Sequence, residues 1–370
     1  MLYLDNAATT LIKPRSVAGE MLHAINTASS PGRGGHYPAM NAAKIVYRCR
    51  EAAGELFNVP EPEQVVFTHN ATHALNIAIN SLISKNDTVL ISGYEHNSVT
   101  RPLEAIGCKI IVAYSPLFDK SAALNAFREK IKDADVVICT HVSNVFGFVL
   151  PIYEIAELCK EYSVPFIVDA SQSAGVLDID FQKLGAEFIA MPGHKALFGP
   201  QGTGLLLCKN GGRILMSGGT GSESRRQQMP DFLPDRHEAG THNVPGIAGL
   251  FAGINYVSSC GLENIRIHEQ SLIKEITGCL SEIDCIELFC GDDKSQIGVL
   301  SFRCSNIACE ELAEKLGEEG ICVRSGLHCS PYAHRSAGTL DTGTVRLSVS
   351  PFVTLENAKD FCRILQKLLN

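Results

Sequence analysis

The chain has 370 residues, of which 45% are hydrophobic and 19% charged, and its formal net charge is -8. The length suggests two domains, and the acidic balance argues against a nucleic-acid surface. The first ten residues, "MLYLDNAATT", contain neither a basic leader nor a long apolar run, and no later segment could span a bilayer. We therefore expect a cytoplasmic protein that binds neither nucleic acid nor membrane.

Fourteen cysteines are scattered through apolar segments such as "VVICTHV" and "GLLLCKN". Small core hydrophobes in a reducing compartment show this distribution. Because the sequence contains no C-x-x-C pair, we expect no metal site.

From about Glu63 to Cys208, short apolar runs alternate with helical stretches; the runs are "QVVFT", "DTVLIS", "KIIVAY", "DVVICTH", "PFIVDA" and "EFIAM". This rhythm predicts an α/β fold, with a mostly parallel sheet and helices on both faces. The strands are apolar at consecutive positions, as expected when both faces are buried. Ligands of such sheets bind at the carboxyl ends of the strands.

The second half of the chain begins with a polar segment, Ser217 to Asn243, that has no clear period. Loops of this length are typically functional or disordered. Two helical stretches (246–261 and 262–283) follow, and then strands ("GVLSFRC", "ICVRSG", "TVRLSVS") mixed with helices ("CEELAEKLGEEG", "LENAKDFCRILQKLL"). We expect a large domain over residues 13–245, and a small α+β domain over 246–370 that includes residues 1–12.

Lys195 lies between two apolar runs in "EFIAMPGHKALFGPQGTGLLLC". A lone lysine usually lies on a solvated face, but at the end of a buried strand it loses pKa and can become a nucleophile. Asp169 ends the preceding run, "VPFIVDA", so neighbouring strands would bring both side chains to one edge of the sheet. They could form only an ion pair. Alternatively, they could hold pyridoxal phosphate, with Lys195 condensed with its aldehyde and Asp169 keeping the ring nitrogen protonated.

That cofactor also needs a phosphate site and a partner for its ring. Asn70 or Thr72 can cap a helix whose N-terminal N–H groups would bind an anion, although capping alone explains both residues equally well. His96 follows the run "DTVLIS" at the same edge of the sheet and could stack on a planar ring.

Taken together, these residues closely resemble the fold-type I, class V aminotransferase superfamily, and within it the group II (SUF-type) cysteine desulfurases and selenocysteine lyases. The resemblance runs almost end to end, through "YLDNAATT", "YEHNS", "THVSNVFG", "VDASQSAG", "GHKALFGPQGTG", "RHEAGTHN", "RSGLHC" and "TVRLSVS". Each motif alone is weak, but their order is highly specific. The resemblance implies a large domain with a mostly parallel, seven-stranded sheet and a smaller α+β domain that carries a catalytic cysteine.

The resemblance implies a role for each matching residue around the cofactor. Lys195 would bind pyridoxal phosphate covalently, Asp169 would bind its ring nitrogen, and His96 would stack on the ring and serve as an acid–base group. The other cofactor-binding candidates are Gln172 for the phenolic oxygen, Asn144 beside ring and substrate, and Ala71, Thr72 and His194 at the phosphate. Thr241, in the polar segment, would reach the phosphate of the other subunit, which implies a homodimer.

The substrate side of the site is implied by the C-terminal motifs. Cys329, in "VRSGLHCSP", matches the catalytic cysteine, although any one of fourteen cysteines could be an inert core thiol. Its neighbours His328 and Arg324 would favour the thiolate if they are cationic.

Arg346 should point away from the apolar face of "TVRLSVS", because that segment alternates. The resemblance makes it the residue that binds the substrate carboxylate; without that match, a surface arginine on an edge strand would be the better interpretation. Arg324, Asn144, Ala7 and His36 are the other substrate-binding candidates.

The chain departs from the family pattern in three places. Pro192 replaces a serine or threonine that often binds the phosphate, and His73 stands where many relatives have an acid. The sequence also begins directly at "YLDNAATT". These differences suggest a divergent branch and affect the transfer of substrate preference more than that of the cofactor.

The resulting hypothesis is a cysteine desulfurase that converts L-cysteine to L-alanine. Its sulfur would pass to Cys329 as a persulfide, and then to an acceptor protein for Fe–S cluster assembly or other sulfur delivery. A selenocysteine lyase is the nearest alternative, and the sequence does not separate the two. Another class V lyase, epimerase or transaminase is less compatible with the cysteine loop, because those reactions need no thiol there. A non-catalytic scaffold is less compatible with the presence of all four residues Lys195, Asp169, His96 and Cys329.

Overall fold

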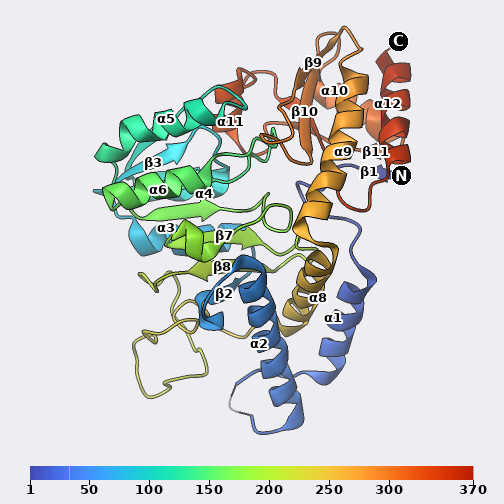
Figure 1. Ribbon diagram of the computed structural model, residues 1–370. Helices are drawn as coiled ribbons and strands as arrows, with labels where there is room; N and C mark the ends of the chain where they lie inside the picture. The colour runs from blue at the N-terminus through green and yellow to red at the C-terminus, as the bar shows by residue number, and fades with distance from the viewer. Residues whose placement is uncertain (33, 370) are drawn as a thin grey trace.

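A computed structural model describes residues 1–32 and 34–369. Its largest sheet has the strand order β2-β8-β7-β6-β5-β3-β4 (Figure 1). The strands are β2 (Val65–Thr68), β3 (Thr88–Ser92), β4 (Lys109–Ala113), β5 (Val136–Thr140), β6 (Phe166–Asp169), β7 (Phe188–Pro192) and β8 (Gly204–Cys208). The strand β8 runs antiparallel to both of its neighbours, β2 and β7, and all other pairs in this sheet are parallel. The predicted α/β fold with a mostly parallel, seven-stranded sheet is therefore confirmed.

Helices cover both faces of this sheet. One face packs against α3 (Ala71–Leu82) and α4 (Asn97–Ile106). The other packs against α2 (Tyr37–Phe57), α5 (Lys120–Lys130), α6 (Ile152–Tyr162), α7 (Phe181–Leu184) and α8 (Val244–Cys260). Consecutive residues of a strand point to opposite faces, so most strands are apolar at consecutive positions, as the sequence indicated.

The structure contains helices that precede residue 63, where the predicted alternation of strands and helices begins. The helix α1 (Arg15–Thr27) packs along α8, and α2 packs against α8 as well (Figure 1). Two short 3-10 helices, η1 (Pro62–Gln64) and η2 (Ile131–Asp133), lead into β2 and β5. Residues 209–243, all of which are described, form no helix or strand, as expected for the polar segment.

A second, antiparallel sheet has the order β12-β13-β10-β9. Its strands are β9 (Ile286–Phe289), β10 (Val299–Cys304), β12 (Arg324–Gly326) and β13 (Thr344–Ser348). The helices α9 (Leu262–Leu280), α10 (Cys309–Glu318) and α12 (Leu355–Leu369) share a core with it, while α11 (Pro331–Ala337) follows the cysteine loop. Because β13 lies between two strands, Arg346 is not on an edge strand, and the surface interpretation of that arginine is excluded.

The N-terminal segment contacts the end of the chain. The strand β1 (Leu2–Tyr3) pairs in parallel with β11 (Ile321–Cys322), and Asp5 forms a bridge with Ser348 of β13. The run "ICVRSG" was expected to be one strand. It divides at Val323, because β11 pairs with β1 while β12 pairs with β13.

The proposed division into residues 13–245 and 246–370 with 1–12 stays a prediction. None of the helices built from the described residues is long and apolar enough to cross a membrane. Within the same residues, no three His, Cys, Asp or Glu side chains are grouped so that they could hold a metal ion.

Candidate active site

The two residues that first suggested a site lie on adjacent strands. In the register of β6 and β7, Asp169 pairs with Ala190, and Lys195 follows the end of β7. Both side chains line a cavity of about 220 Å³ at this edge of the sheet. The same cavity is lined by six further predicted residues, Ala71, Thr72, His96, Asn144, Gln172 and His194.

Lys195 occupies a poorly hydrated environment. It is only partly accessible, and it lines the cavity. Burial lowers the pKa of its ammonium group to about 8, against the opposing effect of Asp169, which is 2% exposed. An amine with this pKa is uncharged in a substantial fraction of molecules near neutral pH, so it can act as a nucleophile or a base.

His96 is uncharged at neutral pH. Burial lowers its pKa to about 4, although Asp169 favours the charged form. Its Nδ1 accepts a 3.0 Å hydrogen bond from the backbone N–H of Ser98, so the proton of the neutral ring is on Nε2. Because His96 is the N-cap residue of α4, its ring is held at the rim of the cavity.

The helix α3 begins at the other end of the cavity. Asn70 is its N-cap and accepts a 2.9 Å hydrogen bond from the N–H of His73, so capping does not occupy Thr72. The Thr72 hydroxyl instead lies 2.8 Å from the hydroxyl of Ser98. Two hydroxyl groups and the free N–H groups of a helix N-terminus form a suitable site for a phosphate. Pro192 also lines the cavity and contributes no donor.

Cys329 is exposed on the loop between β12 and α11. Its carbonyl oxygen accepts a 2.8 Å hydrogen bond from the backbone N–H of Asn97, the first residue of α4. The side chain of Asn144 donates a 2.8 Å hydrogen bond to the carbonyl oxygen of His328. These contacts hold the cysteine loop against the start of α4, directly after His96, and against Asn144, and both His96 and Asn144 line the cavity.

His328 does not supply the positive charge that the sequence suggested. Burial, and next the positive charge of Arg346, lower the pKa of its ring to about 2. The ring is therefore neutral, and its Nε2 lies 3.2 Å from the carbonyl oxygen of Thr344. Of the two expected cationic neighbours of Cys329, only Arg324 remains.

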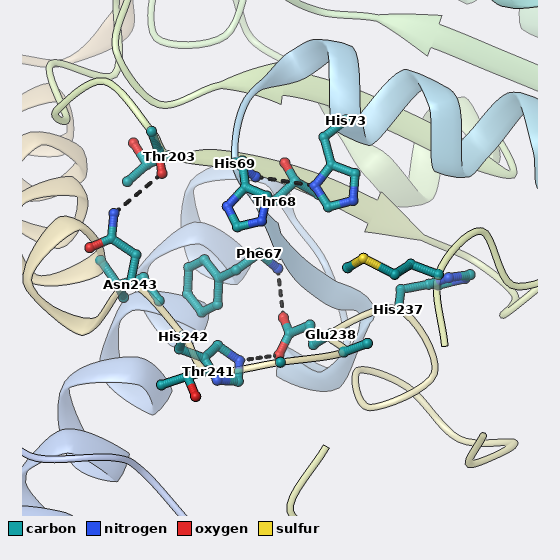
Figure 2. A pocket seen from close by; sticks show the side chains of 15 residues that line it. Phe67, Thr68, His69, His73, Thr203, His237, Glu238, Thr241, His242 and Asn243 are labelled. Carbon is teal, nitrogen blue, oxygen red and sulfur yellow. Dashed lines mark hydrogen bonds and ion pairs between the residues drawn. The ribbon is translucent and has the colours of Figure 1, made fainter. Parts of the chain in front are cut away.

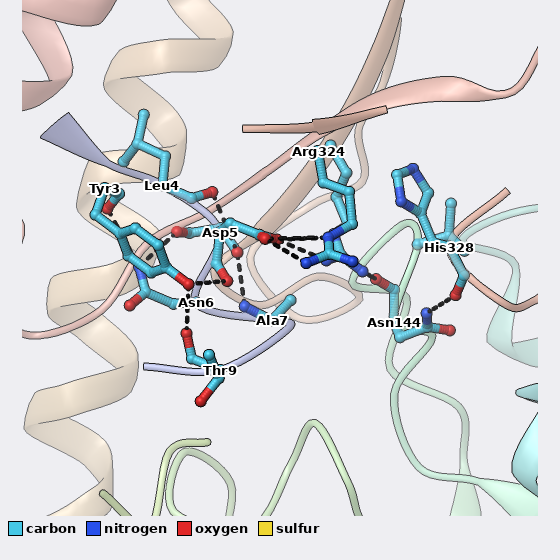
Figure 3. Close-up of polar contacts among 12 residues, drawn as sticks. Tyr3, Leu4, Asp5, Asn6, Ala7, Thr9, Asn144, Arg324 and His328 are labelled. Atoms are coloured by element: carbon cyan, nitrogen blue, oxygen red, sulfur yellow. Dashed lines mark hydrogen bonds and ion pairs between the residues drawn. The ribbon is translucent and has the colours of Figure 1, made fainter. Parts of the chain in front are cut away.

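Two arginines, Arg324 and Arg346, share the carboxylate of Asp5 beside this loop, and Figure 3 shows the contact of Arg324 with Asp5. Arg346 donates 2.9 Å hydrogen bonds to Asp5 Oδ1 and to the carbonyl oxygen of Asn144. Arg324 donates to both carboxylate oxygens of Asp5, with the shortest contact at 2.8 Å. The Arg346 side chain is 3% exposed, and within the described part of the chain its Nε has no hydrogen-bond partner. A buried guanidinium with a free N–H can bind a further carboxylate.

Comparison with known proteins identifies the family. The aminotransferase class-V family model matches residues 2–361. The chain belongs to this family. It is 32% identical to a probable cysteine desulfurase of Methanothermobacter thermautotrophicus, over 99% of this chain and 94% of that protein. A cysteine desulfurase of Synechococcus elongatus is 30% identical, over 100% of this chain and 60% of that protein.

Solved structures agree with this assignment. The apo structure of a cysteine desulfurase from Thermococcus onnurineus has a TM-score of 0.91 and 29% identity, covering 100% of this chain and 94% of that one. The Escherichia coli cysteine desulfurase CsdA has a TM-score of 0.87 over 99% of this chain and 94% of that one, but at 23% identity it supports the fold alone.

Class V enzymes depend on pyridoxal phosphate, and the cavity fits that cofactor. Its walls include an amine, Lys195, a buried carboxylate, Asp169, and a helix N-terminus with free N–H groups. These are the three groups that the aldehyde, the ring nitrogen and the phosphate require. The roles of the individual residues remain predictions.

The other predicted residues lie around this class V site in different ways. Ala7 accepts a 3.0 Å hydrogen bond from Gln172 Nε2, and it lines a small cavity on another side of Lys195. His36 is exposed and caps α2, and it is absent from the described residues that line the main cavity.

Thr241 is exposed in a separate pocket beside the start of α3 (Figure 2). His69, His73 and His242 line the same pocket. There, Glu238 accepts hydrogen bonds from the N–H of Phe67 and from His242, as Figure 2 shows.

Asp5 and Ser330 are site residues to which no role was assigned from the sequence. Asp5 lies in the quoted motif "YLDNAATT", but only the fold brings it to Arg324 and Arg346. Ser330 follows the cysteine directly, and its hydroxyl contacts Asn144. The sequence signal that could have identified Ser330 was its position as a polar residue directly beside the predicted catalytic cysteine.

Proposed function

We propose that the protein is a cysteine desulfurase that converts L-cysteine to L-alanine and transfers the sulfur to Cys329. The observation that carries this proposal is the docking of the Cys329 loop on Asn97 and Asn144, at the rim of the cavity lined by Lys195. Lyases and transaminases of the same fold have no use for a thiol in that position. The relatives named cysteine desulfurases support the same activity.

The residues around the cavity divide the work of this reaction. The cofactor would supply an electron-withdrawing ring that accepts the electrons of the substrate Cα–H bond. Arg346, with its free Nε, would hold the substrate carboxylate, and Arg324 would assist it. Lys195, whose pKa of about 8 leaves a basic amine available, would remove the Cα proton.

The sulfur step would follow at the mouth of the cavity. The Cys329 thiolate attacks the substrate sulfur, the substrate C–S bond breaks, and the sulfur remains on Cys329 as a persulfide. The three-carbon remainder takes up protons and leaves as alanine. The neutral His96 ring, with its proton on Nε2, would exchange a proton near the departing sulfur.

We further propose a group II (SUF-type) enzyme that acts as a homodimer, in which Thr241 reaches the phosphate bound by the other subunit. The exposure of Thr241 in a pocket beside the start of α3 supports this arrangement. An acceptor protein would remove the persulfide sulfur for Fe–S cluster assembly or another sulfur-requiring process.

The test is a parallel assay of the reconstituted protein with L-cysteine and L-selenocysteine. It follows alanine, sulfide or selenide, and a persulfide trapped on Cys329. Alanine together with a Cys329 persulfide is the expected result from cysteine. Turnover of selenocysteine alone would identify a selenocysteine lyase, and absence of alanine from both substrates would refute the proposal.

A further inference from the structure

The cysteine loop has an unfavourable backbone conformation that its neighbours must stabilise. His328 and Cys329 are consecutive residues with φ of 48° and 58°. Residues other than glycine rarely adopt this left-handed region, because the Cβ atom then lies too close to the backbone. Because two of them adjoin at the reactive thiol, the loop needs specific contacts to keep Cys329 in this position.

Asn144 and Ser330 provide those contacts. The Asn144 amide group donates to the carbonyl oxygen of His328 at 2.8 Å, and its Oδ1 accepts a 2.5 Å hydrogen bond from the hydroxyl of Ser330. The amide thus binds the residues on both sides of Cys329. Figure 3 shows Asn144 directed at His328. Ser330 is 0% exposed, so its hydroxyl has no water to replace this partner.

The same asparagine faces the reaction cavity. Asn144 is among the residues that line the cavity with Lys195 and Asp169. Its Oδ1 accepts from Ser330 and one of its two N–H groups is used by His328, so one N–H remains for a bound molecule. A single side chain therefore connects the contents of the cavity with the loop that carries the thiol.

We propose that Ser330 is a positioning residue that acts through Asn144 and keeps Cys329 at the mouth of the cavity for sulfur transfer. The pair, Asn144 and Ser330, is called the latch below. This inference rests on the proposed function, because it assigns Cys329 as the sulfur acceptor. Ser330 would not touch the substrate. It would control the position from which the Cys329 thiol attacks the substrate sulfur.

The test compares the Ser330→Ala holoenzyme with the unaltered one. Without the hydroxyl the latch opens more often, so persulfide formation on Cys329 in a single turnover should slow by about three- to tenfold, the effect of one buried hydrogen bond. Alkylation of Cys329 by iodoacetamide, without substrate, should change by a similar factor, because the exposed thiol leaves the surroundings in which the latch holds it; the rate is measured by peptide mass spectrometry against the exposed Cys290. Cofactor absorption and the spectral change on adding L-cysteine should be unaltered.

Three controls separate the latch from a general loss of stability. Ser330→Thr keeps the hydroxyl and should restore both rates. Ser336→Ala removes a comparable 2.7 Å hydrogen bond, from α11 to the carbonyl oxygen of Gly93, and should leave both rates unchanged. The thiol of Cys139, which is 0% exposed, should remain unreactive in each variant.

An unchanged alkylation ratio in Ser330→Ala would overturn the proposal, as would equal effects of Ser330→Ala and Ser336→Ala. Failure of the proposed function is distinguishable, because the unaltered enzyme would then form no persulfide on Cys329. In that case a changed alkylation ratio in Ser330→Ala would still support the latch.

Discussion

Replacing Asp5 by asparagine tests how the arginine pair is oriented. Asp5 joins Arg346, whose side chain is 3% exposed, to Arg324, whose side chain is 52% exposed. The exposed contact contributes at most about 1 kcal/mol, whereas a hydrogen bond to a buried charge contributes about 1.5–3 kcal/mol. If Arg346 loses that orientation, the KM for L-cysteine should rise roughly 10- to 100-fold. The kcat should change less, because Lys195 and Cys329 remain in place.

The assay is steady-state alanine release from L-cysteine, with cofactor binding followed by visible absorption. Asp360→Asn is a matched control, since it makes the same substitution in an ion pair with Arg363 whose side chains are 46% and 77% exposed. Its KM should not change. A lower KM in Asp5→Asn would refute the reasoning, because it would mean that Asp5 competes with the substrate carboxylate for Arg346 instead of orienting the arginine.

Four further outcomes are expected. Lys195→Ala should lose both the absorption band of the covalently bound cofactor and alanine release; an unchanged band and rate would exclude the lysine role. Cys329→Ala should abolish sulfur transfer from cysteine but retain selenocysteine cleavage, since selenium leaves more readily, and equal loss on both substrates would contradict this. Cofactor loading of the apoprotein should accelerate with pH and level off above about pH 8, because only the uncharged Lys195 amine reacts; a midpoint near 10.5 would show that burial does not lower the pKa. Glu238 also forms a buried ion pair with Arg50, so Glu238→Ala should lower the free energy of unfolding in urea by about 3–5 kcal/mol, because the charge of Arg50 stays buried and unpaired; a loss below about 1 kcal/mol would be inconsistent with this ion pair.

The central sheet was predictable from the sequence because its strands are buried on both faces. Continuous apolar runs such as "VVICT" and "FIVDA" identify strands of this kind, and their carboxyl ends locate the ligand edge. Asp169 and Lys195 follow adjacent strands for that reason, and the cavity forms between them.

The remaining features depend on contacts that leave no local pattern. The strands β1 and β11 have two residues each, too few to show a period, and the division of "ICVRSG" arises from pairing with two different sheets. The neutral state of His328 follows from its burial in the folded protein, which its sequence neighbours do not reveal. Asp5 meets Arg324 and Arg346 only because the N-terminal segment lies beside β13.

The position of Asp5 also sets an order of events during synthesis. The cavity residues from Ala71 to Lys195 leave the ribosome while Asp5 still has neither arginine to bind. Domains generally fold as units from the N-terminal side. Here, however, β1 can pair only after β11 has been synthesised, and Asp5 can bind both arginines only after β13 has been synthesised. Contacts so distant along the chain form slowly, because a long loop has to close before they contribute. A nascent chain can therefore contain all the residues of the cavity well before the contacts of Asp5 with Arg324 and Arg346 form.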